Sequence, residues 1–173
     1  RQDGNAEWLR LIVHPVVGEQ NQLLYFSVFG TVLTKTITTS REQSDTIKAI
    51  YRSMAVIEFD LQGHVLTAND QFLSAMGYNE SEIIGQHHRV FCETEEANSA
   101  EYQQFWSKLR QGQFIADRFK RIDKYGNVIW LEATYNPISN DADQLYKVMK
   151  FATVITEQVN REIAISQAAE IAY

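Results

Sequence analysis

The chain has 173 residues, of which 45% are apolar and 22% charged, a balance typical of a soluble globular protein. Its formal net charge of −6 argues against a nucleic-acid-binding surface, which needs clustered basic residues. The single cysteine, Cys92, excludes an internal disulfide framework and a zinc site built from cysteines, and it favours the reducing cytoplasm.

No apolar run reaches the roughly 20 residues that a membrane-spanning helix needs, so we expect no span in this chain. The chain begins at Arg1 without an initiator methionine or a signal pattern, which suggests a piece of a longer protein. Whether a longer parent has membrane spans stays open.

The first predicted elements are two antiparallel strands, residues 7–16 and 23–34, rich in β-branched and aromatic residues. The polar segment Gly18–Gln22 between them predicts a turn, and therefore a hairpin. Apolar residues recur at helical spacing from Thr39 to Met54, which predicts a connecting helix with one apolar stripe. We assign residues 1–38 to the hairpin segment and 39–53 to the connecting helix.

A complete domain is predicted over residues 54–156. Its first helix is expected to begin at Asn69, whose side-chain oxygen can cap it, and to end at Gly77. The expected elements are strands 54–60 and 65–68, helices 69–77, 81–84 and 99–110, and strands 114–122, 128–138 and 145–156. Hairpins join the last three strands, which favours an antiparallel sheet with helices on one face, an α+β fold. Residues 157–173 are predicted to form a polar exit helix.

An internal repeat links the two ends of the chain. Residues 4–34 align without a gap against residues 126–156, each pair 122 positions apart (126 − 4 = 122). The identities include Trp8/Trp130 and Pro15/Pro137. Because a repeat of this length marks whole domains, the chain is expected to carry the closing strands of a first domain and a complete second copy.

The element order and the strings AVIEFDLQGHVLTANDQFLSAMGY, EIIGQHH, FWSKLRQGQF and KYGNVIWLEATYNPI resemble the PAS sensor domain over residues 50–156. Residues 1–34 resemble the end of a preceding PAS copy. GQHHRVFC and the exit sequence look most like tandem PAS modules of bacterial methyl-accepting chemotaxis proteins, of the energy-taxis or biofilm-dispersion type.

The resemblance implies a five-stranded antiparallel sheet and a small-molecule pocket between that sheet and the short helices. It also implies signalling through the flanking helices to a chemotaxis signalling domain downstream in cis. PAS domains often end in Asp-Ile-Thr, where the aspartate ties the last strand to the outgoing linker. This chain has Val154-Ile155-Thr156 instead, so that tie is expected to be absent.

Two adjacent histidines, His87 and His88, lie in the stretch that borders the pocket in PAS sensors. A neutral imidazole nitrogen can ligate haem iron, and His88 is the candidate ligand. The alternative is that the two side chains point in different directions and serve as turn or surface residues. No haem attachment motif is present, and no other metal site is predicted.

Flavin is the other candidate cofactor. Trp106, Trp130 and Asn136 are of the types that flank an isoalloxazine ring and bond its polar edge. Trp130 recurs as Trp8 in the first copy, so a shared packing role is the simpler account. Asn136 is replaced there by His14, which makes Asn136 more specific to the second copy.

The helix 99–110 carries an apolar stripe of Tyr102, Phe105, Trp106 and Leu109, predicted to pack on the sheet and to line any pocket there. Phe119 belongs to the core or to the pocket. A flavin–cysteine photoadduct is not expected, because the family's cysteine would stand at the position of His88. Cys92, four residues later, is interpreted as a buried filler. FAD, haem and no cofactor all stay open.

The sequence contains no Gly-rich phosphate loop, nucleophile elbow or HExxH motif, so enzyme activity is not expected. The leading hypothesis is a cytoplasmic sensor that binds a small ligand or redox cofactor and relays the signal to a chemotaxis-type output domain. The alternatives are a cofactor-free dimerisation module and the regulatory domain of a PAS-linked kinase or cyclase. A homodimer is predicted, because the hairpin carries apolar residues and strand edges that need cover.

Overall fold

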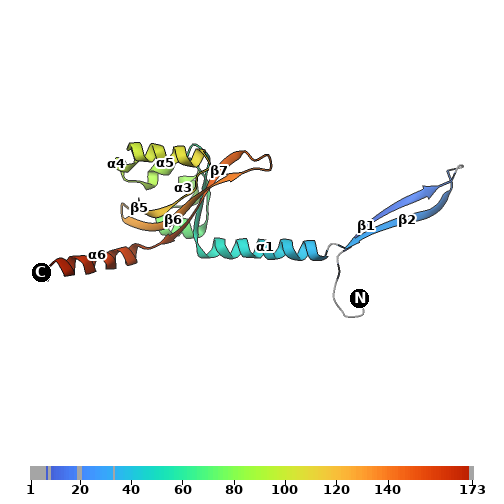
Figure 1. Cartoon of the computed structure of the whole chain (residues 1–173), viewed down its shortest axis with the longest axis horizontal. Coiled ribbons are helices and arrows are strands. Elements are labelled where there is room, and N and C mark those ends of the chain that lie inside the picture. The colour runs from blue at the N-terminus through green and yellow to red at the C-terminus, as the bar shows by residue number, and fades with distance from the viewer. Residues whose placement is uncertain (1–6, 8, 19–20, 33, 172–173) are drawn as a thin grey trace. The chain divides into compact units, whose positions relative to one another are not determined.

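The computed structural model describes residue 7 and residues 9–18, 21–32 and 34–171 (Figure 1). Trp8 and residues 172–173, at the end of the predicted exit helix, lie outside the described residues. The chain divides into two compact units, Arg1–Ala49 and Ile50–Tyr173. No helix in the described ranges is long and apolar enough to cross a membrane.

The first unit contains a β-hairpin followed by a helix. Strands β1 (Leu9–Val17) and β2 (Leu23–Val32) pair antiparallel, as predicted. Helix α1 covers Thr34–Ser53, so it begins earlier than the predicted Thr39. The reason is the repeat: strand pairing ends at Val32, and the backbone turns helical at Thr34, which lies 122 residues before the first residue of the exit helix α6 (Thr156–Ile171).

The second unit contains the predicted five-stranded antiparallel sheet, in the order β4-β3-β7-β6-β5. Its strands are β3 (Ala55–Phe59), β4 (Val65–Ala68), β5 (Ile115–Ile122), β6 (Val128–Ser139) and β7 (Leu145–Val154). Its helices before β5 are α2 (Asp70–Met76), α3 (Glu80–Ile83), η1 (His88–Phe91), α4 (Thr94–Ala97) and α5 (Ala100–Arg110). The predictions missed η1 and α4, because four residues are too few for a helical period to show and no glycine follows either segment, as Gly85 follows the predicted helix 81–84.

The internal repeat extends to the strand register. Leu9 pairs with Val32 as Leu131 pairs with Val154, and the intervening pairs keep the same offset. Both ladders shift register at equivalent positions near the turn. The β1–β2 hairpin therefore has the backbone pairing of β6–β7, which makes the two copies comparable residue by residue.

The core of the second unit lies between the sheet and the short helices. Leu131, Ala133 and Tyr135 alternate along β6 toward this side and are buried. Figure 1 shows α4 and α5 on the same side of the sheet. Phe72 of α2 and Trp106 of α5 belong to the same core cluster, so the predicted apolar stripe of α5 does face the sheet.

Asn69 joins three elements of the second unit. Its side-chain oxygen accepts from the Phe72 amide, as the predicted cap, and also from the Val56 amide at 2.9 Å. Its side-chain nitrogen donates to the carbonyl oxygens of Tyr51 and Met54, each at 2.8 Å. Asn69 therefore fastens the end of α1 to both β3 and α2.

Thr156 fastens the other flanking helix. Its hydroxyl accepts from the Trp130 amide at 3.0 Å, and the Ile155 amide donates to the Trp130 carbonyl at 2.8 Å. Thr156 thus ties the first turn of α6 to β6 in a chain that lacks the aspartate of the Asp-Ile-Thr pattern.

We expect Asn69→Ala to lower the free energy of unfolding by about 2–4 kcal/mol, because it removes a helix cap and leaves two carbonyl groups and an amide without their partner. Urea unfolding followed by circular dichroism measures the change. Asn98→Ala is the matched control, since Asn98 donates only to the exposed Thr94 carbonyl, and it should lose less than about 1 kcal/mol. Equal losses in the two variants would contradict the role of Asn69.

Candidate functional site

His88 lies at the centre of the interior of the second unit. It is 0% exposed and begins η1, directly after the loop residue His87. Its Nδ1 lies 2.9 Å from the Tyr102 hydroxyl of α5, and its Nε2 lies 3.0 Å from the Tyr135 hydroxyl of β6. Both ring nitrogens are therefore engaged, and the imidazole bridges the helices and the sheet.

Aromatic rings fill the space around His88. The ring centroids of Phe59 and Trp106 lie 5.2 and 5.6 Å from that of His88. Phe105 packs edge-to-face on Tyr135 at 4.8 Å between centroids. These contacts lie in the favourable range for aromatic pairs, so the protein's own side chains pack this region.

Two buried cations lie beside this aromatic group. Arg121 of β5 is 2% exposed and Lys150 of β7 is 1% exposed. The Arg121 guanidinium contacts Glu96 of α4 at 3.0 Å and the Tyr135 hydroxyl at 3.4 Å. The Lys150 ammonium lies 4.9 Å from the centroid of the Tyr135 ring. We call His88, Tyr102, Arg121, Tyr135 and Lys150 the interior polar cluster.

Burial and positive charge shape the protonation of this cluster. Burial, followed by the charges of Arg121 and Lys150, lowers the pKa of His88 well below its usual value. Burial, together with Arg121, also lowers the pKa of Lys150 well below its usual value. Burial raises the pKa of Tyr135 to about 12. At neutral pH His88 is therefore an uncharged imidazole between two neutral phenols.

Two buried donors in this region lack a hydrogen-bond partner: the Trp106 Nε1 and the Arg121 Nε. A buried polar group without a partner is unfavourable by about 1–3 kcal/mol. Native structures contain few of them, and each needs an explanation. Here both lie within the same aromatic and cationic region.

The structure places three of the six candidate site residues on the helix side of the sheet, two on the opposite face and one at the edge. His88, Trp106 and Phe119 lie on the helix side, where Phe119 packs on Tyr135. His87 lies at the edge, half-buried, where its Nδ1 accepts from the Arg89 amide. Its ring centroid lies 6.3 Å from that of Tyr102 and 6.1 Å from that of Trp106, two residues that the His88 ring also contacts.

Trp130 and Asn136 lie on the opposite face of the sheet. Along β6 they alternate with the buried Leu131 and Tyr135, so their side chains point away from the helices. Asn136 donates to Thr134 and to a β7 carbonyl on that face. Grouping these two residues with Trp106 in one pocket was therefore wrong.

The residues present do not fit either candidate cofactor as predicted. A haem iron needs a free imidazole nitrogen, but hydroxyl groups occupy both nitrogens of His88. One isoalloxazine ring cannot contact Trp106, Trp130 and Asn136 together, because the sheet separates them. Cys92 is buried beside His88, and burial raises the pKa of its thiol to about 11, which disfavours a reactive thiolate.

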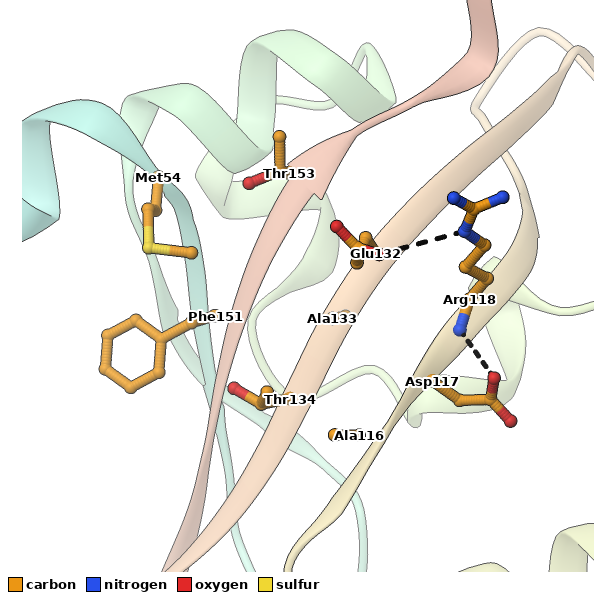
Figure 2. A pocket seen from close by; sticks show the side chains of 9 residues that line it. All are labelled: Met54, Ala116, Asp117, Arg118, Glu132, Ala133, Thr134, Phe151 and Thr153. Carbon is orange, nitrogen blue, oxygen red and sulfur yellow. Dashed lines mark hydrogen bonds and ion pairs between the residues drawn. The ribbon is translucent and has the colours of Figure 1, made fainter. Parts of the chain in front are cut away.

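The opposite face of the sheet carries a hollow of about 580 Å³ (Figure 2). Met54 and Phe151 lie at one side of it, and Arg118 pairs with Glu132 at the other, as Figure 2 shows. Arg118 also contacts Glu162 of α6 at 3.0 Å. This face therefore contacts α6 through Arg118, and Met54 at its other side directly follows the last residue of α1.

Sequence reasoning missed Arg121, Tyr135 and Lys150. Strand positions in a predicted sheet do not reveal which polar residues are buried, since one residue of register reverses the faces. The repeat held a signal: the counterparts of Tyr135 and Lys150 in the first copy are Val13 and Val28, which pair with each other in the same register. A comparison of the copies at inward positions would have found the pair.

The lowered pKa of His88 predicts the direction in which the stability of the fold changes with pH. Below pH 6.5 the unfolded chain protonates this imidazole and the folded chain does not, so stability falls as the pH decreases. His88→Gln should reduce this loss by about 1 kcal/mol between about pH 7.5 and about pH 5.5, measured by urea unfolding. His64→Gln, at an exposed position of the same unit, controls for the loss of a histidine as such. An unchanged slope in His88→Gln would count against a neutral, buried imidazole.

Residues 65–152 match the family model described as PAS fold. Biofilm dispersion protein BdlA of Pseudomonas aeruginosa is 36% identical over 159 residues, which cover 92% of this chain and 38% of that protein. The aerotaxis receptor of Escherichia coli is 27% identical over 105 residues, which cover 61% of this chain and 20% of the receptor. The chain thus spans less than half the length of either relative.

The fold is also similar to the crystal structure of a PAS domain from Colwellia psychrerythraea. That comparison has a TM-score of 0.57 at 21% identity and covers 66% of this chain and 98% of the other. At this identity the similarity concerns the fold alone. The matched family model, the antiparallel sheet and the two relatives agree: this chain belongs to the PAS fold family and is homologous to chemotaxis-type sensor proteins.

Proposed function

We propose that this chain is a sensory module in which a small molecule acts on the interior polar cluster and the change is relayed through α1 and α6. The observation that carries the proposal is the position of β6. Its inward face presents Tyr135 to the cluster, while Trp130, on the same strand, holds the first turn of α6 through Thr156. A displacement of β6 would therefore reach both the interior polar cluster and the first turn of α6.

Strand β5 offers a second route. Arg121 on its inward face belongs to the cluster, and Arg118 on its outward face pairs with Glu162 of α6. A ligand shifts such an equilibrium only if its affinity differs between two arrangements of the helices. Thr156 and Glu162 hold α6 to the sheet through individual polar side-chain contacts. Only small rearrangements of these contacts are therefore needed for α6 to pack on the sheet in a second way.

The rest of the proposal draws on the relatives. By analogy with the aerotaxis receptor and the biofilm dispersion protein, the relay would end in a chemotaxis-type signalling domain in cis, in the cytoplasm. The alternative of a cofactor-free interaction module is favoured by one observation, the packing of the protein's own aromatic rings around His88. The proposed sensor differs from it in requiring communication between the interior and the helices.

Tyr135→Phe tests this communication. The change removes the hydroxyl that contacts His88 and Arg121 and leaves the ring in place. If the cluster and α6 are coupled through β6, hydrogen exchange at the Ile155 and Val159 amides should rise about fivefold, in line with the loss of about one net hydrogen bond.

Tyr125→Phe is the control, because it removes a hydroxyl from an exposed turn of the same unit, and it should leave these two amides unchanged. Exchange that increases only around Tyr135 and η1, with Ile155 and Val159 as slow as in the wild type, would refute the relay.

The second part of the proposal is self-association through the first hairpin. The face of β6–β7 that is buried in the second copy corresponds in the first copy to Leu11, Val13, Phe26 and Val28, and each of these is more than half exposed. Burial of apolar area is favourable by about 25 cal/mol per Å², so this face favours a partner surface. A second copy of the chain carries the same face and would meet it symmetrically.

Light scattering should therefore give about twice the 19.9 kDa mass of the chain, and Phe26→Ser combined with Val28→Ser should shift it toward the monomer. Ile12→Ser, on the other face of the hairpin, is the control and should keep the dimer. A wild-type chain that is monomeric at high concentration would disprove self-association.

A further inference from the structure

The interior polar cluster contains two buried basic side chains and one neighbouring carboxylate. Arg121 and Lys150 are both buried, and the one carboxylate that pairs with either of them in the described part of the chain is Glu96, which contacts Arg121. The Lys150 side-chain nitrogen faces the rings of Phe72 and Tyr135, and burial and Arg121 lower its pKa well below the usual value. An anion bound beside Arg121 would favour the protonated form of Lys150, so this region is suited to a negatively charged ligand.

The fold does not require these polar residues. In the first copy, Val13 and Val28 occupy the positions of Tyr135 and Lys150 and pair in the same register. An apolar pair would avoid the desolvation of a buried ammonium and a phenol. Tyr135 and Lys150 are therefore a feature of the second copy beyond what the shared hairpin needs.

Arg121 has an unused donor and a space beside it. Its Nε lacks a partner, although the side chain is more than nine-tenths buried. It lines a hollow of about 170 Å³ together with Glu96, Ser99, Glu101, Tyr102 and Phe105. Since one water takes about 30 Å³ of liquid volume, this space is comparable with a molecule of about six heavy atoms.

Glu96 pairs with the Arg121 guanidinium from the side nearer the solvent. Its carboxylate oxygens lie 3.0 and 3.2 Å from the Arg121 Nη1, its side chain is 37% exposed, and it belongs to α4, a helix of four residues. An exposed side chain on so short a helix can leave without disturbing the core. A free carboxylate in its place would accept from the same Nη1 in a charge-assisted hydrogen bond.

From these features we infer that Arg121 is the receptor for a small monocarboxylate, which enters through the hollow beside α4 and α5 and displaces Glu96. Arg121 would hold the carboxylate, and the negative charge of the ligand would favour protonation of Lys150 nearby. Glu96 acts as an internal competitor that keeps the site closed without ligand, and its release frees α4. This inference rests on the proposed function, since it names the ligand class that the sensor would detect.

Isothermal titration calorimetry and thermal-shift measurements with sodium acetate, propionate and butyrate test the inference. Acetamide and propionamide are the uncharged control compounds, and sodium chloride keeps the ionic strength equal in all samples. The wild type should bind at least one carboxylate saturably and none of the amides. Glu96→Gln removes the competing charge and keeps the shape of the side chain, so its affinity should rise about tenfold. Arg121→Gln and Arg121→Lys should each lose at least about tenfold.

Lys120→Gln is the matched control, because Lys120 pairs with Glu93 between the same two segments but is exposed, and its affinity should equal that of the wild type. Near-ultraviolet circular dichroism verifies that each variant is folded, and Arg121→Lys keeps the charge if Arg121→Gln does not fold. The inference is overturned if Glu96→Gln binds no carboxylate, if amides bind equally well, or if the folded Arg121 variants retain wild-type affinity. Those outcomes would not contradict the proposed relay through β6, which is tested separately by amide hydrogen exchange at Ile155 and Val159.

Discussion

The alternation of side chains along β6 is the constraint on which the rest of the second unit depends. Successive residues of a strand point to opposite faces, so Tyr135 reaches the buried imidazole of His88 while Asn136 bonds on the far side. The same strand holds the first turn of α6 through Trp130. One strand therefore connects the packed interior, the open face of the sheet and an exit helix.

The interior packs aromatic rings closely around buried ionisable side chains. His88 is kept neutral by burial and by the nearby cations, and in that state it bridges two hydroxyl groups that join α5 to the sheet. Arg121 brings a buried positive charge, which Glu96 offsets from the edge. A network of this kind is sensitive to the removal of a single hydroxyl, because each partner left behind is buried.

The duplicated hairpin separates what the fold needs from what the second copy adds. Both copies share register, the irregularity near the turn and a helix that starts at the same offset, at Thr34 and Thr156. The shared backbone tolerates a valine pair or a Tyr135–Lys150 pair at one inward position. Inward residues of β6 and β7 are therefore where polar side chains distinguish the second copy from the first, whereas Asn136 lies on the opposite face.

The sequence by itself determined the order of the elements and the cap at Asn69, because periodicity and turn residues act locally along the chain. It also contained the repeat, and its resemblance to PAS domains implied the five-stranded architecture. It also identified His88, Trp106 and Phe119 as interior candidates. Only the tertiary structure decided the partners of His88, the burial of Arg121 and Lys150, and the separation of Trp130 and Asn136 from the pocket. Those properties depend on which face of each strand meets the helices, and the contacts of β5, β6 and β7 across the sheet set that face.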